Sequence, residues 1–358
     1  MLKISAARLT RKFTTTFTRP LLATLAVFVL LPVALAQVSG TNYELGNPGD
    51  PNFNQLLGIN NGRVIVGYFG DGTVVANNGY VLVPKNHYPK ENFTNLPAGD
   101  FASQTQAIGI NNTQLEEIVG FYQDHTTGFI HGFLDENGVQ TTLDDPAGLP
   151  PNVTTPAQNL LGINDIGEAA GFWTDNDGHE HGFVVTINSG SPSKSTFTEI
   201  PPSTFAGAVA TQASNITNNK EVCGFWTDKS GNNHGFFGRL GETFYTFNVE
   251  IDGVTATSTT PFGCNNNGEI VGTFTDSSGA HGFLSAFGAY FQFDYPGSSQ
   301  TPAFGVSGTI INGINDRGDF VGFLSNGNKV SGFVQLAQGP LVVLAGGTAL
   351  GKVARPRE

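Results

Sequence analysis

Cysteine is nearly missing from this 358-residue sequence, which contains only Cys223 and Cys264. Two cysteines cannot supply a disulfide framework, so a packed core must stabilise the fold even in an oxidising compartment. The two cysteines fall at different places of neighbouring sequence repeats. Two interpretations stay open: a pair of small buried apolar side chains, or a single disulfide between them.

Positive charge is also scarce, with 17 Lys and Arg against 29 Asp and Glu. Five of the basic residues lie in the first 19 positions, so the rest of the chain carries 12 basic and 29 acidic residues, a formal charge of 12 − 29 = −17. A surface this negative repels phosphate backbones and anionic lipids. We therefore expect no nucleic-acid partner. The acidity alone does not decide whether calcium binds.

Sequence motifs of catalysis are missing as well. The chain has no G-x-S-x-G, no H-E-x-x-H and no P-loop. Paired carboxylates for glycoside cleavage stay open because such pairs form in space, and the adjacent pairs Glu116–Glu117 and Asp144–Asp145 are expected to be solvated. The turn that begins at Asp175 lacks the distal carboxylate of a calcium loop. The sequence thus predicts no catalytic residue, no cofactor and no metal ligand.

One long apolar run is present, from Leu21 to Leu35, and it follows five basic residues and no acidic one. It ends in Ala34-Leu35-Ala36, which has the small-x-small form of a cleavage site. These features predict a secretory signal peptide over residues 1–36. A membrane anchor is the alternative, which Pro32 and the cleavage site disfavour. We expect a secreted protein, extracellular or periplasmic, with no membrane span after signal removal.

Glycine is abundant, and it marks an internal repeat. A "VG"-type step recurs at intervals of 53, 51, 53, 48 and 50 residues, at Gly67, Gly120, Gly171, Gly224, Gly272 and Gly322. Each copy predicts four short strands separated by Asn/Asp-Gly turns, and no window shows a helical period. Six units of about 50 residues predict an all-β, six-bladed β-propeller of four-stranded antiparallel blades over residues 37–338. Residues 339–358 are left as a C-terminal tail.

An open solenoid or a β-helix is the alternative architecture. Closure is favoured because the last copy lacks an aromatic fourth strand, whereas TNYELGNPGDPNFNQLLGIN near the N-terminus resembles a fourth strand plus linker. The N-terminal strand would then complete the last blade. We expect a monomer, because the repeats bury one another's faces within one chain.

Three further columns of the repeat are expected to build the scaffold. An asparagine precedes the first turn, at Asn60, Asn111, Asn164, Asn265 and Asn315. An aromatic residue in the third strand is expected to pack between blades, at Phe133, Phe183, Phe236, Phe283 and Phe333, with Tyr80 in the first copy. A histidine begins the third strand, at His131, His181, His234 and His281. Ring symmetry separates these histidines, so we expect hydrogen-bonding residues and not a shared metal site.

The repeat resembles a known family. The stretches GINDRGDFVGF, GCNNNGEIVGTFTDSSGAHGFL and FDYPGSSQTPAFG resemble the HAF family of probable extracellular repeats, found in exported bacterial proteins. The resemblance covers all six copies and implies a propeller outside the cytoplasm, with no established reaction. Copy one lacks the histidine beside Tyr80, copy six has Ser331 there, and copy four has Thr217 in place of asparagine. These departures weaken any role that needs six equivalent histidines or asparagines.

The connections from each fourth strand to the next first strand are long and variable, as in PAGLPPNVTTPAQNLLG and PPSTFAGAVATQASN. Such linkers gather on one face of a propeller, where differing loops carry recognition. We expect a non-catalytic scaffold that binds a protein or glycan through these linkers. An extracellular polysaccharide hydrolase or lyase on a propeller scaffold is the alternative, and a structural envelope component is a third hypothesis.

Overall fold

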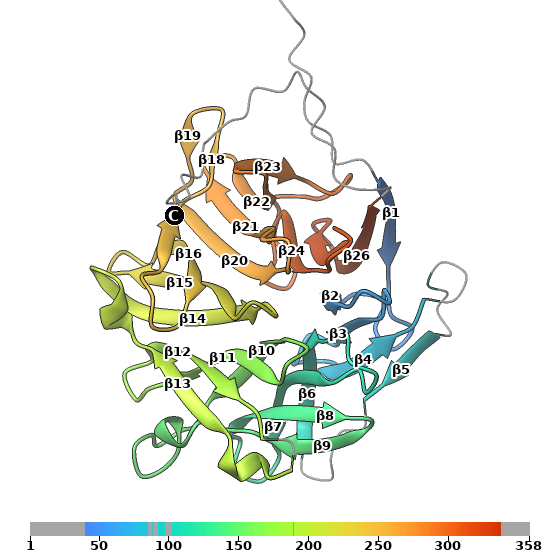
Figure 1. Ribbon diagram of the computed structural model, residues 1–358. Coiled ribbons are helices and arrows are strands. Elements are labelled where there is room, and N and C mark those ends of the chain that lie inside the picture. Colours follow the sequence, from blue (N-terminus) through green and yellow to red (C-terminus); the bar gives the residue numbers. More distant parts are fainter. Residues whose placement is uncertain (1–39, 85–87, 89–91, 97–101, 189, 338–358) are drawn as a thin grey trace, which may run out of the picture.

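The chain forms six four-stranded antiparallel sheets arranged around a central axis (Figure 1). The computed structural model describes residues 40–84, 88, 92–96, 102–188 and 190–337. The predicted signal peptide (1–36) and tail (339–358) lie outside the described residues. Within the described ranges, no helix is long and apolar enough to cross a membrane. The predicted six-bladed β-propeller is confirmed.

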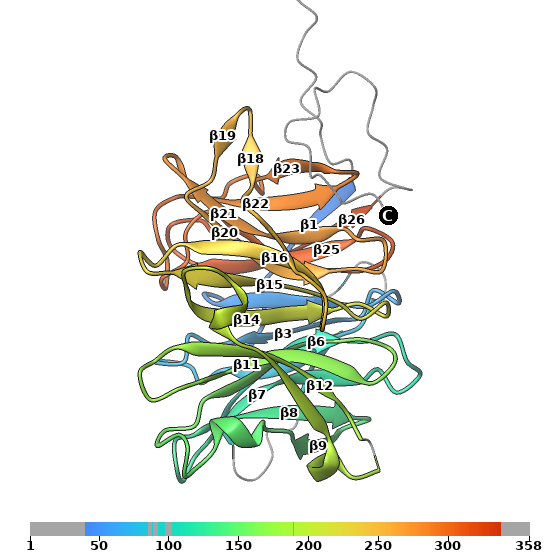
Figure 2. The same cartoon turned by 60° about the vertical axis from the view of Figure 1, so that its left-hand side comes forward.

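Each blade runs from an innermost strand near the axis to an outermost strand at the periphery (Figures 1 and 2). The strands are, for blade 1, β2 (Asn54–Ile59), β3 (Ile65–Phe69), β4 (Asn78–Leu82) and β5 (Phe93–Asn95); for blade 2, β6 (Ala102–Ile110), β7 (Ile118–Asp124), β8 (Ile130–Glu136) and β9 (Val139–Thr142); for blade 3, β10 (Gln158–Ile163), β11 (Glu168–Thr174), β12 (Glu180–Thr186) and β13 (Thr196–Ile200); for blade 4, β14 (Ala208–Ile216), β15 (Glu221–Asp228), β16 (Asn233–Arg239) and β17 (Tyr245–Phe247); for blade 5, β20 (Ser258–Cys264), β21 (Ile270–Asp276), β22 (Gly279–Ala286) and β23 (Ala289–Phe293); and for blade 6, β24 (Thr309–Ile314), β25 (Phe320–Ser325), β26 (Val330–Ala337) and β1 (Gly40–Leu45).

The ring is closed by the N-terminal strand, as expected. Strand β1 pairs antiparallel with β26 in a continuous register from Gly40 opposite Ala337 to Leu45 opposite Gly332. An additional hairpin that the sequence reading missed, β18 (Glu250–Ile251) with β19 (Val254–Thr255), lies in the connection between blades 4 and 5. Short 3-10 helices occur in other connections, such as η2 (Pro146–Gly148) and η4 (Pro202–Thr204).

The aromatic column of the third strands forms the centre of the core. These rings are fully buried, each at most 1% exposed: Tyr80, Phe133, Phe183, Phe236, Phe283 and Phe333. Each such burial stabilises the fold by about 1.5–3 kcal/mol relative to exposure. The clusters they join contain residues of two neighbouring blades, as where Phe183 packs with Val119 and Leu134 of blade 2. The blades are therefore held together mainly by apolar packing between sheets.

The "VG" glycines have a steric cause. In every blade the innermost strand contains a β-bulge, for example between Leu160 and Gly162, and the residue before the bulge pairs with the glycine, Gly171 in blade 3. A Cβ at Gly171 would collide with the carbonyl oxygen of Asn159 and would lie 3.1 Å from the ring of Phe183. The bulge, the glycine and the aromatic ring thus form one unit that recurs in each blade.

Candidate functional site

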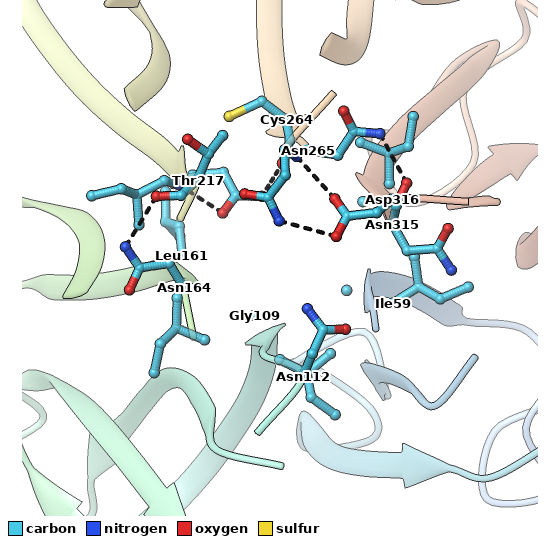
Figure 3. A pocket seen from close by; sticks show the side chains of 18 of the residues that line it. Ile59, Gly109, Asn112, Leu161, Asn164, Thr217, Cys264, Asn265, Asn315 and Asp316 are labelled. Atoms are coloured by element: carbon cyan, nitrogen blue, oxygen red, sulfur yellow. Dashed lines mark hydrogen bonds between the residues drawn. The ribbon is translucent and has the colours of Figure 1, made fainter. Parts of the chain in front are cut away.

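A small cavity lies on the ring axis, where the six innermost strands end (Figure 3). Its volume is about 70 Å³, enough for a few water-sized groups. The wall carries the residue that precedes each repeat asparagine, or Thr217 in blade 4: Ile59, Ile110, Ile163, Ile216, Cys264 and Ile314. We call this cavity the axial well. The fourth-to-first linkers begin the innermost strands at their opposite ends, so they do not line the well.

The opening of the well is surrounded by the residue that follows the repeat asparagine in each blade. This rim consists of four amides and two carboxylates: Asn61, Asn112, Asp165, Asn218, Asn266 and Asp316. The backbone N–H of each rim residue donates to the Oδ1 atom of the next blade's rim residue, at 2.6–2.9 Å, and the sixth bond returns from Asp316 to Asn61. Six side chains therefore form one closed ring of hydrogen bonds.

The two carboxylates of the rim lie three blades apart, on opposite sides of the ring. Asp165 accepts from the side-chain amides of Asn112 and Asn218. Asp316 accepts in the same way from Asn61, at 2.9 Å, and from Asn266, at 3.0 Å. Each asparagine amide donates one N–H to a carboxylate and has a second N–H available for a ligand, because an amide nitrogen carries two donors. The rim is half-buried except for Asn112, which is exposed.

A second ring lies deeper, formed by the repeat asparagines named from the sequence. The side-chain amide of each donates to the backbone carbonyl of its counterpart in the next blade, at 2.9–3.2 Å, in the pairs Asn60–Asn111, Asn111–Asn164, Asn164–Thr217, Asn265–Asn315 and Asn315–Asn60. Their Oδ1 atoms accept backbone N–H groups of their own turns, as Asn164 does from Glu168. We call these contacts the inner relay. The inner relay links adjacent blades, and it engages the side chains of these asparagines in hydrogen bonds within the protein.

The inner relay has one gap, between blades 4 and 5, because Thr217 has no amide with which to reach Asn265. A disulfide between Cys223 of β15 and Cys264 of β20 joins the same two blades. Of the two interpretations of the cysteines, the disulfide is therefore correct, and the expectation of two free apolar side chains is wrong. Spacing in the sequence could not show this, because the ring brings together positions 41 residues apart.

The repeat histidines lie at the other end of the blades, where the third strands begin. Each lies against an aromatic ring near the end of the second strand, as His181 does against Trp173, with ring centroids 4.2 Å apart. The Nδ1 atom of each contacts a polar side chain near the end of the fourth strand, in the pairs His131–Asp144, His181–Glu199, His234–Asn248 and His281–Asp294. The hydrogen bond to Asp144 raises the pKa of His131. The contacts of each histidine lie within its own blade, so the four do not converge.

The adjacent carboxylate pairs differ from the expectation that they are solvated. Asp144 accepts from His131, and Asp145 is 6% exposed, where burial raises its pKa. Glu117 accepts from the amide of Asn111, whereas Glu116 is exposed. The prediction was therefore wrong for Asp144 and Asp145: Asp144 bonds His131 and the N–H of Gly132, and the backbone of Asp145 bonds the side chain of Gln158.

The acidic turn of blade 3 brings Asp175, Asp177 and His179 together, with potential ligand atoms within 4.8 Å of one another. Oδ1 of Asp175 already accepts the backbone N–H groups of Asp177 and His179, and Oδ2 lies 3.0 Å from Nε2 of His181. The same arrangement in blade 4, led by the N–H of Asn232, lowers the pKa of Asp228 to about 2. These aspartates order the turns, as expected from their position at the turn start.

The rim was missed in the sequence, although a signal for it was present. An Asn or Asp follows the repeat asparagine in all six copies, including copy four, where Thr217 breaks the asparagine column. These residues were interpreted only as hairpin-turn chemistry. Their convergence depends on closure of the ring, which places six turns around one axis.

Comparisons with known proteins add the following. No profile of a known family matches the chain, and no curated protein matches it. The resemblance to HAF repeats therefore stays a prediction. Among solved structures, the chain is similar to a lectin of Aleuria aurantia in complex with alpha-methyl-L-fucoside, at 12% identity and a TM-score of 0.48, over 85% of this chain and 96% of the lectin.

Two further solved structures are similar. One is a Trypanosoma rangeli sialidase in complex with sialic acid, at 8% identity and a TM-score of 0.45, over 85% of this chain and 58% of the sialidase. The other is the β-propeller domain of the Trilobed protease from Pyrococcus furiosus, at 9% identity and a TM-score of 0.41, over 80% and 96%. The chain also spans 40% of the length of a prolyl endopeptidase. Likenesses this distant say nothing about ligand or activity.

Proposed function

We propose that the chain is a binding protein of the cell exterior that holds a neutral glycan at the axial well without cleaving it. The observation that carries this proposal is the closed rim of four amides and two carboxylates around an open cavity. The location outside the cytoplasm rests on the predicted signal peptide and on the resemblance to exported repeats.

The chemistry of the rim suits sugar hydroxyl groups. A hydroxyl donates one hydrogen bond and accepts two, and the rim offers both the second N–H of each amide and free lone pairs on amide and carboxylate oxygens. Two carboxylates at the opening, on a chain of net charge −12, disfavour uronic acids, sialic acids and phosphates. A neutral sugar is therefore the preferred ligand class.

The same geometry supports binding more than bond cleavage. Both rim carboxylates are held along the ring by two amides each. Glycoside hydrolysis needs two carboxyl groups on either side of the scissile bond that can exchange protons with substrate and water. The alternative of a polysaccharide hydrolase or lyase stays a prediction, which product analysis with purified protein would test.

The experiment uses a neutral glycan array followed by calorimetric titration of the best binder. Asp316→Ala and Asn112→Ala remove rim groups and should each weaken binding at least about tenfold, since lost hydrogen bonds to charged or polar partners cost about 1–3 kcal/mol. Thr154→Ala, in the linker before β10, is the matched control on the opposite face and should bind normally. If Thr154→Ala and other linker variants abolish binding while the rim variants do not, recognition lies on the linkers and the rim proposal is wrong. Binding of acidic glycans alone would also contradict it.

A further inference from the structure

We propose that Ser278, His281 and Asp294 form a nucleophilic serine site in blade 5 that hydrolyses small neutral carboxylic esters. Ser278 Oγ lies 2.8 Å from Nε2 of His281. Nδ1 of the same ring lies 2.9 Å from Oδ2 and 3.0 Å from Oδ1 of Asp294, and the side-chain amide of Gln292 lies 3.0 Å from Nδ1 and donates to Oδ2 of Asp294. Nε2 can accept the serine proton in the tautomer in which Nδ1 carries the ring proton and donates it to Asp294. A hydroxyl, an imidazole and a carboxylate are thus connected in the order that activates a serine. This site lies at the opposite end of the blade from the axial well and is independent of the proposed glycan binding.

The arrangement is particular to blade 5, because its turn is one residue shorter. The histidine follows the turn aspartate by six positions in blades 3 and 4, at Asp175–His181 and Asp228–His234, but by five in blade 5, at Asp276–His281. In blades 3 and 4 the Nε2 atom contacts the turn aspartate, at 3.0 and 3.3 Å. In blade 5 the distance from Nε2 to Asp276 is 3.6 Å, and the serine hydroxyl takes that position instead.

The imidazole is held and the nucleophile is accessible. The side chain of His281 is 9% exposed and packs against the ring of Phe274, with centroids 5.3 Å apart. Ser278 is exposed at the tip of the turn between β21 and β22. Because Ser278 stands on an exposed turn, a small acyl ester can reach its hydroxyl. The negative charge of the chain disfavours anionic esters.

A second group competes for the serine proton. Oδ1 of Asp276 lies 2.6 Å from Ser278 Oγ and also accepts the backbone N–H of Ser278. The hydroxyl therefore has two acceptors for one proton, and attack requires that the proton moves to His281. Because of this competition we expect Ser278 to react slowly. Covalent labelling, which accumulates, is therefore a more sensitive test than turnover of an ester.

The reaction balances without an oxidant or cofactor. Ser278 Oγ bonds to the ester carbonyl carbon while its proton passes to Nε2 of His281. The bond from that carbon to the alkoxy oxygen breaks, and the leaving oxygen takes the proton from Nε2. Water then attacks the acyl-serine, one of its protons moves through Nε2 to Oγ, and a carboxylic acid is released. Asp294 is a positioning residue that orients the imidazole.

The test is labelling of the folded full chain with a fluorophosphonate, with the adduct located by mass spectrometry. Ser277 is the adjacent serine of the same turn, and Ser230 occupies the corresponding position of blade 4, where His234 contacts Asp228. We expect an adduct on Ser278 and not on Ser277 or Ser230. Ser278→Ala should abolish labelling and Ser277→Ala should leave it unchanged. Both sites are exposed, so both variants should fold.

Three further variants test the roles of His281 and Asp294. His281→Gln should slow labelling and hydrolysis of p-nitrophenyl acetate by about 100-fold or more, the usual contribution of a general base. Asp294→Ala should slow both, and Asp294→Glu should restore part of the rate, with thermal melting as the check on folding. Labelling of Ser277 or Ser230 as fast as Ser278 would overturn the proposal. So would labelling of Ser278 that His281→Gln leaves unchanged.

Discussion

Replacing Thr217 with asparagine should restore the hydrogen bond that the inner relay lacks between blades 4 and 5. In the other blades the amide at this position reaches the next blade's backbone carbonyl at 2.9–3.2 Å, so the new amide should reach the carbonyl of Asn265. A buried hydrogen bond of this kind contributes about 1 kcal/mol. The disulfide between Cys223 and Cys264 already fixes this junction, so we expect the gain to be largest when the disulfide is absent.

The disulfide is expected to contribute more to the free energy of unfolding than the hydrogen bond that Thr217→Asn restores. Its two cysteines are 41 residues apart, and closing a loop of that length in the unfolded chain corresponds to about 4 kcal/mol at 25 °C. Cys223→Ala/Cys264→Ala should therefore lower the free energy of unfolding by about that amount. Adding Thr217→Asn to this double variant should raise the free energy of unfolding by about 1 kcal/mol. Adding Thr217→Asn to the protein that keeps the disulfide should raise it by less.

The assay is urea unfolding followed by tryptophan fluorescence, which reports on Trp173 in blade 3 and Trp226 in blade 4. Thr217→Ser is the matched control, because serine keeps the hydroxyl and lacks the amide. The reasoning is refuted if Thr217→Asn fails to stabilise the cysteine-free variant, or if loss of the disulfide leaves the unfolding midpoint unchanged.

Two other predictions concern pH and sterics. The pKa of His131 is raised in the folded state, so its contact with Asp144 stabilises the fold fully below the pKa of the unfolded state and loses this effect as pH rises through the folded pKa. In urea titrations, His131→Gln should therefore lower the free energy of unfolding more at pH 5 than at pH 9. A loss of stability that grows with pH would contradict this prediction. Gly224→Ala should cost about 3 kcal/mol, because its Cβ would lie 2.8 Å from the ring of Phe236 and against a backbone carbonyl. Gly178→Ala, at φ +84° with open space around it, should cost about 1 kcal/mol, and equal costs would show that strand packing does not require Gly224.

Much of the fold could be predicted because its causes repeat locally. The turn glycines, the bulge-facing glycines and the third-strand aromatics each recur once per blade, so period and strand pattern together indicated a propeller. The closing strand was also predictable, because the segment around Tyr43 supplies what the last copy lacks.

The site could not be predicted in the same way. The rim residue Asn61 bonds Asp316, 255 positions away, and the disulfide joins two blades whose sequences give no pairing rule. The serine arrangement in blade 5 depends on a single missing residue in a turn, which moves Ser278 to His281. The rim and the disulfide depend on closure of the ring, and the serine arrangement depends on the shorter turn of blade 5. The repeat pattern of the sequence shows neither.

Because β1 pairs with β26, the sixth sheet is built from the first and the last strand of the described chain. Until the earliest and latest strands meet, blade 6 has an unpaired edge and blade 1 has an uncovered face. A chain without β1 would leave the edge of β26 unpaired, while β2 could still pack against β24, β25 and β26. The pairing of β1 with β26 thus protects blade 6 against fraying. A circular permutant that places the chain ends in another blade should keep the propeller and should begin to unfold at that blade instead.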